Sequence, residues 1–124
     1  MSKAIIGVEG FDTVAARVRK TARRLDAKRA VRPADYHLNF GSAALLMQEL
    51  SAKRMETLRM LKREGPLSIY ALAKRLGRNY SNVHQDIARL LEHGLAEKDE
   101  SGRVFVPWDD VIVRIDTSVM SEAA

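Results

Sequence analysis

The clearest candidates for recognition chemistry are the polar side chains of the run NYSNVHQDIAR, which begins at Asn79. The amides of Asn82 and Gln85 can donate and accept at the same time, which suits the N6 and N7 atoms of adenine in the major groove of DNA. Ser81 and His84 can donate or accept at several base edges. These residue types favour contact with nucleotide bases, provided that one helix face presents them together.

A helix over residues 79–92 would present these side chains. Its apolar residues recur at the spacing i, i+4, i+7, i+8, which places them on one face. They are Val83, Ile87, Leu90 and Leu91, and the helix closes at Gly94. Because each residue advances about 100° around a helix, the polar residues, Arg89 included, lie on the opposite face or at its borders.

A shorter helix precedes this one. Ser68 stands where an N-cap would, and Gly77 lies just past the expected C-terminus, where glycine tolerates a positive φ. The apolar stripe between them, spaced i, i+3, i+4, i+7, consists of Ile69, Leu72, Ala73 and Leu76. The two helices and their tight turn predict a helix-turn-helix.

The chain then continues as a β-hairpin. We expect strands over residues 95–99 and 103–106, with a turn at Glu100-Ser101-Gly102 that places glycine at the bend. A helix-turn-helix followed by a hairpin is a winged helix-turn-helix, whose second helix usually lies in the major groove of DNA. The expected fold class is therefore mainly α with a small β-sheet (α+β), a winged helix-turn-helix with an N-terminal helix and strand extension.

This part of the chain resembles a known family. The run PLSIYALAKRLGRNYSNVHQDIARLLEHGLAEKD, followed by GRVFVPWDDV, is similar to prokaryotic MarR-like winged-helix transcriptional regulators. More narrowly, it looks like small regulators whose second helix carries an N-V-H-x-D-I-x-x-L-x-x-x-G-L pattern and whose wing ends in V-P-W/Y-D. The resemblance covers residues 50–116 and implies sequence-specific DNA binding for transcriptional control, with repression expected. Some relatives resemble the antitoxin half of toxin–antitoxin operons.

The predicted contacts to double-stranded DNA fall into three groups. Residues of the turn would contact phosphate, the outer face of the second helix would read bases, and the wing would reach a minor groove or phosphate. Asp86 would be awkward beside phosphate, so we expect it to pair with a basic residue of the core such as Arg75. The predicted DNA-binding set is Ser68, Arg78, Asn79, Tyr80, Ser81, Asn82, His84, Gln85, Arg89, Lys98 and Arg103.

Elements outside the two helices complete the prediction. Strands are expected over residues 3–8, 36–40 and 111–115, and helices over 13–30, 43–50 and 52–64, the last with Ser51 as its N-cap. Inward residues of the last two helices are expected to be Leu45, Leu46, Leu50, Met55, Leu58 and Leu61. Trp108 is interpreted as a core residue at the base of the wing or as an interface anchor. The predicted organisation is an extension (1–41), the DNA-binding domain (42–116) and a frayed tail (117–124).

Composition and charge restrict the possible functions. The chain has 124 residues, of which 46% are hydrophobic and 30% charged, typical of a water-soluble domain. No apolar run is long enough to span a membrane, the first residues do not resemble a signal peptide, and we expect a cytoplasmic protein. The net charge of +5 and the absence of cysteine favour a polyanionic partner and exclude disulfides and thiol chemistry.

Charge is also unevenly distributed along the chain. Residues 17–32 hold eight basic side chains and one acid, whereas residues 92–124 hold eight acids and three bases. The basic helix expected over residues 12–30 has three interpretations: it lies along DNA phosphates, packs on another subunit or protein partner, or is a solvated helix. A symmetric homodimer built from residues 1–50 is expected, since one recognition helix contacts only a few base pairs.

An enzyme is not indicated. His37, His84 and His93 do not have metal-ligand spacing, and no glycine-rich phosphate loop is present, so neither a cofactor nor a metal is expected. The alternative to a transcriptional regulator is an antitoxin-type interaction module. Such a module would neutralise a cognate toxin and bind DNA for autoregulation.

Overall fold

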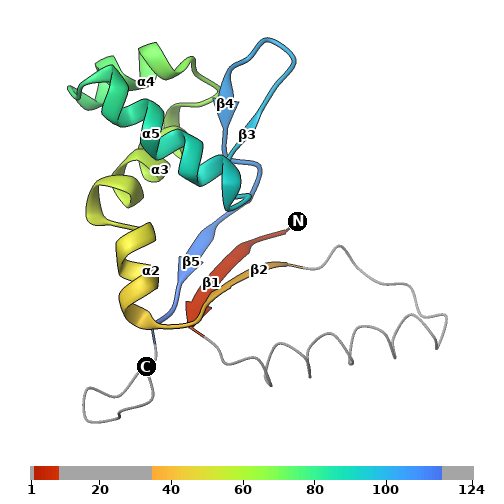
Figure 1. The fold of residues 1–124 in the computed structure, drawn as a ribbon. Coiled ribbons are helices and arrows are strands. Elements are labelled where there is room, and N and C mark those ends of the chain that lie inside the picture. Colours follow the sequence, from red (N-terminus) through yellow and green to blue (C-terminus); the bar gives the residue numbers. More distant parts are fainter. Residues whose placement is uncertain (1, 9–34, 116–124) are drawn as a thin grey trace, which may run out of the picture. The chain divides into compact units, whose positions relative to one another are not determined.

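The computed structural model describes residues 2–8 and 35–115, and it divides into two compact units (Figure 1). Unit 1 comprises Met1–Leu46 and Asp109–Ala124, and unit 2 comprises Met47–Trp108. These limits differ from the predicted domains, which placed a boundary after residue 41 and kept residues 109–116 with the helices. The difference arises because the last strand pairs with the first strand rather than with the hairpin. The chain is a mixed α+β protein, as expected.

Unit 1 is built on a parallel sheet with the strand order β2-β1-β5. In the central register Ile6 lies between Leu38 and Val113, and the side chain of Ile6 is fully buried. All three strands were predicted, and the strand over residues 36–40 has its partner at the N-terminus. The strands are β1 (Ala4–Val8), β2 (Tyr36–Phe40) and β5 (Val111–Val113).

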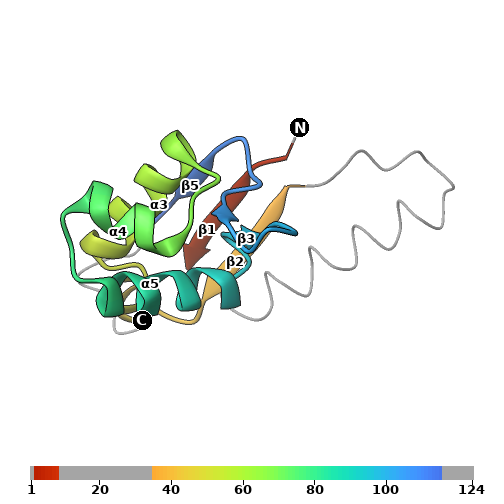
Figure 2. The ribbon, with the colours of Figure 1, turned by 90° about the horizontal axis from the view of Figure 1, so that it is seen from above.

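Unit 2 contains three helices whose limits follow from their capping residues (Figures 1 and 2). The hydroxyl oxygens of Ser51 and Ser68 accept from the amides of Arg54 and Ala71 at 3.3 and 3.1 Å. Both caps were predicted, and each satisfies an amide that has no partner within its helix. The helices are α3 (Ala52–Glu64), α4 (Ile69–Leu76) and α5 (Tyr80–Glu92), preceded by α2 (Ala43–Glu49), whose residues are divided between the two units.

The apolar residues of α4 and α5 occupy the predicted inner faces. The fully or nearly fully buried side chains of unit 2 include Leu50, Leu58, Leu61, Leu72, Val83, Ile87, Leu90, Leu95 and Val104. Two inward assignments are wrong, because Leu45 and Met55 are 43% and 36% exposed. The buried face of α3 instead includes Thr57, a polar residue that lies about 200° around the helix from Met55 and belongs to the ion-pair network described below.

The predicted hairpin consists of β3 (Glu97–Lys98) and β4 (Val104–Phe105), paired antiparallel. Its turn is closed by Asp99, whose carboxylate accepts from the backbone amides of Ser101 and Arg103 at 2.9 and 3.0 Å. Gly102 adopts a φ of 81°, the conformation for which glycine is favoured.

Trp108 fastens the end of the hairpin to the end of α5. Its indole Nε1 donates to the carbonyl oxygen of Gly94 at 2.9 Å, and the side chain is half-buried. Trp108 therefore lies at the base of the hairpin, as expected, but as a half-buried residue and not as part of the fully buried core.

Two predicted segments lie outside the described residues. They are the basic helix over residues 13–30, with the expected DNA or subunit contacts of residues 12–30, and the tail over 117–124. Within residues 2–8 and 35–115, no helix has the length and apolar character needed to cross a lipid bilayer.

Gly77 provides a test of the turn between α4 and α5. Its φ is 64°, and a Cβ atom added there would meet nothing within 4 Å. A substitution at Gly77 is therefore disfavoured by the positive φ alone and not by a clash with neighbouring atoms. We expect Gly77→Ala to lower the free energy of unfolding by about 1–2 kcal/mol and Gly77→Asn to cost less, because Asn adopts this conformation more readily. Urea denaturation measures both.

Gly41→Ala is the control, since Gly41 also has open space around its Cβ position but no positive φ. Equal decreases in stability for Gly41→Ala and Gly77→Ala would contradict the explanation.

Candidate functional site

The outer face of α5 presents the polar residues that the sequence singled out. The side chains of Ser81, Asn82, His84 and Gln85 are all exposed. They lie on the side of the helix away from its fully buried apolar residues, of which Val83 is the first. The predicted orientation of this helix is therefore confirmed.

The start of α5 is fixed by Asn79. Its side-chain oxygen accepts from the amide of Ser81 at 2.8 Å, so Asn79 acts as the N-cap. The next residue, Tyr80, is 48% exposed, and its ring centroid lies 5.8 Å from that of His84 in a tilted arrangement. Tyr80 and His84 therefore form a small exposed aromatic pair at the end of the polar face.

Arg78 does not lie where the sequence suggested. We expected its guanidinium to face outward from the turn, but the side chain is only 18% exposed and points into unit 2. Its Nη1 donates to Asp86 Oδ2 at 2.8 Å and to the Thr57 hydroxyl at 2.9 Å. This assigns Arg78 a structural role and removes it from the phosphate-contacting set.

Asp86 has different partners from the one predicted. Arg75 instead pairs with Glu64 at 3.2 Å, and Asp86 lies between Arg78 and Arg54, whose Nε donates to Oδ1 at 3.1 Å. Spacing along the sequence favoured a basic residue of the neighbouring helix α4. The fold instead brings in an arginine from α3, 32 residues away in the sequence.

The guanidinium of Arg89 also binds carboxylates of the same chain. It forms a bidentate ion pair with Glu49, in which Nε donates to Oε2 at 3.2 Å and Nη2 donates to Oε1. A further bond runs from Nη1 to Glu92 Oε2 at 2.6 Å. Although Arg89 lies at the border of the outer face, its guanidinium is turned along the protein surface toward carboxylates.

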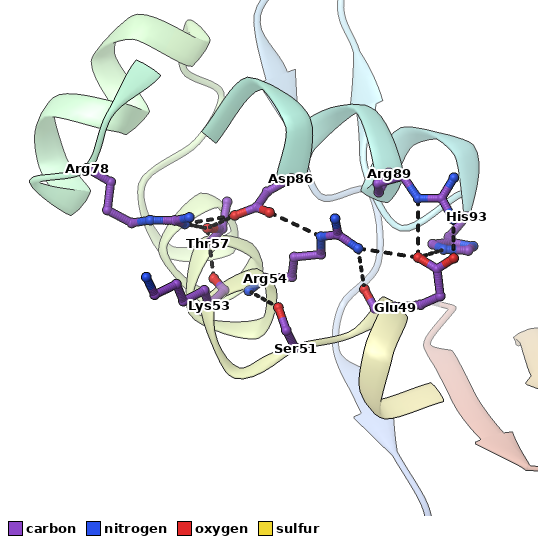
Figure 3. A network of polar contacts seen from close by, with 9 residues as sticks. All are labelled: Glu49, Ser51, Lys53, Arg54, Thr57, Arg78, Asp86, Arg89 and His93. Atoms are coloured by element: carbon purple, nitrogen blue, oxygen red, sulfur yellow. Dashed lines mark hydrogen bonds and ion pairs between the residues drawn. The ribbon is translucent and has the colours of Figure 1, made fainter. Parts of the chain in front are cut away.

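Arg54 joins these contacts into one network (Figure 3). While its Nε binds Asp86, its Nη1 donates to the backbone oxygen and the carboxylate of Glu49 at 3.1 and 3.3 Å. The carboxylates and guanidiniums alternate from the turn before α5 to its last residue, in the order Arg78, Asp86, Arg54, Glu49, Arg89 and Glu92. The network fixes α5 to α3 and leaves the three arginines balanced by three acids.

The network shifts the pKa values of one pair. Hydrogen bonds from Arg89, reinforced by its charge and by His93 at 3.6 Å, hold the pKa of Glu49 below its usual range although burial opposes the shift. The same hydrogen bonds, which Arg89 donates to the Glu49 carboxylate, raise the pKa of Arg89. Both groups therefore remain charged at neutral pH.

The remaining predicted contacts lie on the surface of unit 2. Ser68 is exposed at the start of α4, and Lys98 is exposed on the hairpin. Arg103 is 54% exposed and pairs with Asp99 at 3.2 Å, an ion pair open to solvent that costs little to exchange for another anion.

The profile of the HVO_A0114 family matches residues 49–113. The chain belongs to this family. No curated protein and no solved structure matches the chain.

The segment shared with the HVO_A0114 family contains the whole ion-pair network. It begins at Glu49, the carboxylate that binds Arg54 and Arg89, and it includes the polar face of α5 and the hairpin. Residues 1–48 lie outside the match. The family is thus defined over the part of the chain in which the candidate site lies.

Three exposed residues of the family segment were not predicted from the sequence to belong to the site. Tyr70 is 60% exposed on α4 with the ammonium of Lys74 5.1 Å from its ring centroid, and Ala88 is exposed on α5. None of the three belongs to a predicted apolar stripe. Their absence from the stripes was the signal in the sequence that their side chains would be exposed. Among the described residues, no group of three histidine, aspartate or glutamate side chains is placed to hold a metal ion.

Removing the carboxylate at the centre of the network should destabilise unit 2. Asp86→Ala leaves the guanidiniums of Arg54 and Arg78 without their shared acceptor in a largely buried position. We expect a decrease of about 2–4 kcal/mol in the free energy of unfolding, measured by urea denaturation. Glu64→Gln, which removes the solvent-exposed partner of Arg75, should cost less than about 1 kcal/mol. Similar decreases for the two variants would contradict a central role for Asp86.

Glu49 should make stability depend on acid pH. The pKa of Glu49 is lower in the folded chain than in the unfolded chain. The contribution of its carboxylate to the free energy of unfolding is therefore present above the pKa of the unfolded chain, and it is lost as the pH falls through the pKa of the folded chain. We expect the stability of the wild-type protein to decrease below about pH 4. Glu49→Gln should be less stable at pH 7 and should lose less stability on acidification.

Urea midpoints at neutral and acid pH test this expectation, with the exposed Glu56→Gln on α3 as the control. Parallel pH profiles for the wild type and Glu49→Gln would exclude Glu49 as a source of acid sensitivity.

Proposed function

We propose that this protein is a sequence-specific regulator of transcription that binds double-stranded DNA through α5. The observation that carries the proposal is the outer face of α5. It is exposed, rich in amide and hydroxyl groups, and turned away from the core by the buried apolar residues. An uncharged face that can both donate and accept hydrogen bonds suits base edges.

The arrangement of unit 2 supports this proposal. Three helices followed by an antiparallel hairpin are the order of elements that a winged helix-turn-helix requires (Figure 1). We propose a domain of the MarR-like kind, with α4 and α5 as the two helices of the motif. In such domains the N-terminal part of the second helix contacts bases. The side chains of Ser81, Asn82, His84 and Gln85 occupy this part of α5.

Exposed residues beside α5 are suited to phosphate contacts. Lys74 lies on α4 beside the Tyr70 ring, and the hydroxyl of Tyr80 extends from the start of α5. On the hairpin, Lys98 and Arg103 would contact phosphate or a minor groove. Phosphate contacts of this kind position the helix without selecting a sequence. Ser68 and Asn79 complete the proposed contact set.

We propose further that the protein acts as a symmetric homodimer and represses transcription by occupying promoter DNA. One α5 helix would contact only a few base pairs, whereas two copies on half-sites one helical turn apart would double the recognised sequence. Residues 1–50 are the proposed dimer interface. Light scattering at micromolar concentration should give twice the monomer mass, and a monomeric mass would contradict the dimer.

The DNA-binding proposal is tested by a gel-shift assay with duplexes selected from a random pool. Replacing both Asn82 and Gln85 with alanine should weaken binding to the selected duplex by about tenfold or more for each amide removed, since one good amide–base pairing contributes about 1–3 kcal/mol. Binding to unrelated DNA at low salt should change little, because that binding depends on phosphate contacts.

The matched control is Glu56→Ala, which changes an exposed side chain of α3. Unchanged affinity of the double variant for the selected duplex would contradict base recognition by α5.

A further inference from the structure

The exposed surface of α5 carries no arginine or lysine side chain that is free of a carboxylate partner, since Arg89 is bound by Glu49 and Glu92. The structure describes this helix along its full length, and its exposed residues are Tyr80, Ser81, Asn82, His84, Gln85, Ala88 and Glu92. Arg89 is the one arginine or lysine of this helix, and it is half-buried. Lysine and arginine are the side chains that most often select guanine, through its O6 and N7 atoms.

The two arginines nearest this surface are held elsewhere. Arg78 binds Asp86 and Thr57 inside unit 2, and Arg89 binds Glu49 (Figure 3). Arg89 also binds Glu92. Moving either guanidinium to a base would take from a carboxylate one of its two arginine partners and leave it with Arg54 as its only arginine. That carboxylate is 10% exposed in Asp86 and 17% exposed in Glu49. Such a movement is costly because a poorly hydrated charge loses part of its compensation.

The side chains that point most directly outward are Ser81, Gln85, Ala88 and Glu92. With about 100° between successive residues, these four lie opposite the centre of the buried face formed by Val83, Ile87 and Leu90, and Asn82 lies beside Gln85. In the first two turns and the middle of the helix, the outermost stripe thus combines amides and a hydroxyl with a methyl group, and the Glu92 carboxylate follows at the last residue, where it binds Arg89.

This combination matches A·T base pairs in the major groove. Side-chain amides pair in a bidentate manner with N6 and N7 of adenine, and an alanine methyl group packs against the C5 methyl group of thymine. Asn82, Gln85 and Ala88 each follow the previous one by three residues, which separates them by about 4.5 Å along the helix. This separation is close to the spacing of about 3.4 Å between successive base pairs, so neighbouring pairs would be contacted.

We propose that the half-site contacted by α5 is centred on consecutive A·T pairs, with adenine N6 and N7 bound by Asn82 and Gln85 and a thymine methyl group packed on Ala88. This inference rests on the proposed function and deepens it by naming the bases that are read. The selectivity comes both from the amides and from the internal ion pairs, which keep arginine away from guanine.

The first experiment selects duplexes from a random pool with the full chain and sequences them. We expect the recovered half-site to contain at least two adjacent A·T pairs. A conserved G·C pair at its centre overturns the inference but leaves DNA binding intact. Failure to retain any duplex at low salt overturns the proposed function and this inference with it.

The second experiment changes single atoms in the selected duplex. Replacing an adenine of the half-site with 7-deazaadenine removes the N7 acceptor, and replacing thymine with deoxyuridine removes the C5 methyl group. We expect the first change to weaken binding by about tenfold and the second by a smaller factor. Equal affinity for the natural and the 7-deazaadenine duplexes overturns the inference.

A third experiment tests whether the side chain of Gln85 is the one that contacts adenine. Gln85→Ala should bind the natural duplex more weakly and should lose the preference for adenine over 7-deazaadenine at one position. The control variant Glu56→Ala changes an exposed residue of α3, outside α5, and should keep the full preference for adenine over 7-deazaadenine. If Gln85→Ala discriminates between the two duplexes as the wild type does, Gln85 does not contact adenine.

Discussion

The carboxylate of Asp86 is the contact on which the arrangement of unit 2 depends. It projects inward from α5 and accepts from Arg54 of α3 and from Arg78 in the turn between α4 and α5 (Figure 3). A single acidic side chain thereby connects α3, α5 and the turn that precedes α5. Apolar contacts have little directional preference, whereas a carboxylate bound on both oxygens restricts the rotation of the helix that carries it.

The same network decides what α5 can offer to a partner. The guanidiniums of Arg78 and Arg89, which would otherwise give the turn and the helix a positive surface, are bound by Asp86, Glu49 and Glu92. What remains exposed on the N-terminal part of α5 is an uncharged polar face, and exposed cations are carried by α4 and the hairpin, at Lys74 and Arg103. Under the proposed function, attraction to the DNA backbone and discrimination between bases are therefore assigned to different elements.

Much of the fold could be predicted from the sequence, because local patterns determine where the helices begin and end and how they are oriented. The limits of α3 and α4 follow from Ser51, Ser68 and Gly77, each of which acts within a few residues of its own position. The orientation of α5 also follows from spacing alone, so its exposed polar residues could be predicted together. The partners of Arg78, Asp86 and Arg89 could not, because spacing along one helix contains no information about which residues another helix brings close. Met55 was assigned to the core for the same reason, although Thr57 is the buried residue of α3 that carries a bond of the network.

The pairing of β1 with β5 has a consequence for how the chain is assembled. Ala4 lies opposite Val111, so the sheet of unit 1 brings together residues from nearly the whole span of the sequence, whereas unit 2 forms between them from one continuous segment. During synthesis, the helices and the hairpin can be complete while β1 still lacks its final neighbour. Closing a sheet from such distant strands carries a large loop-closure entropy, which slows that step relative to folding of the helices. The sheet of unit 1 therefore cannot acquire its full set of backbone hydrogen bonds until Val113 has left the ribosome.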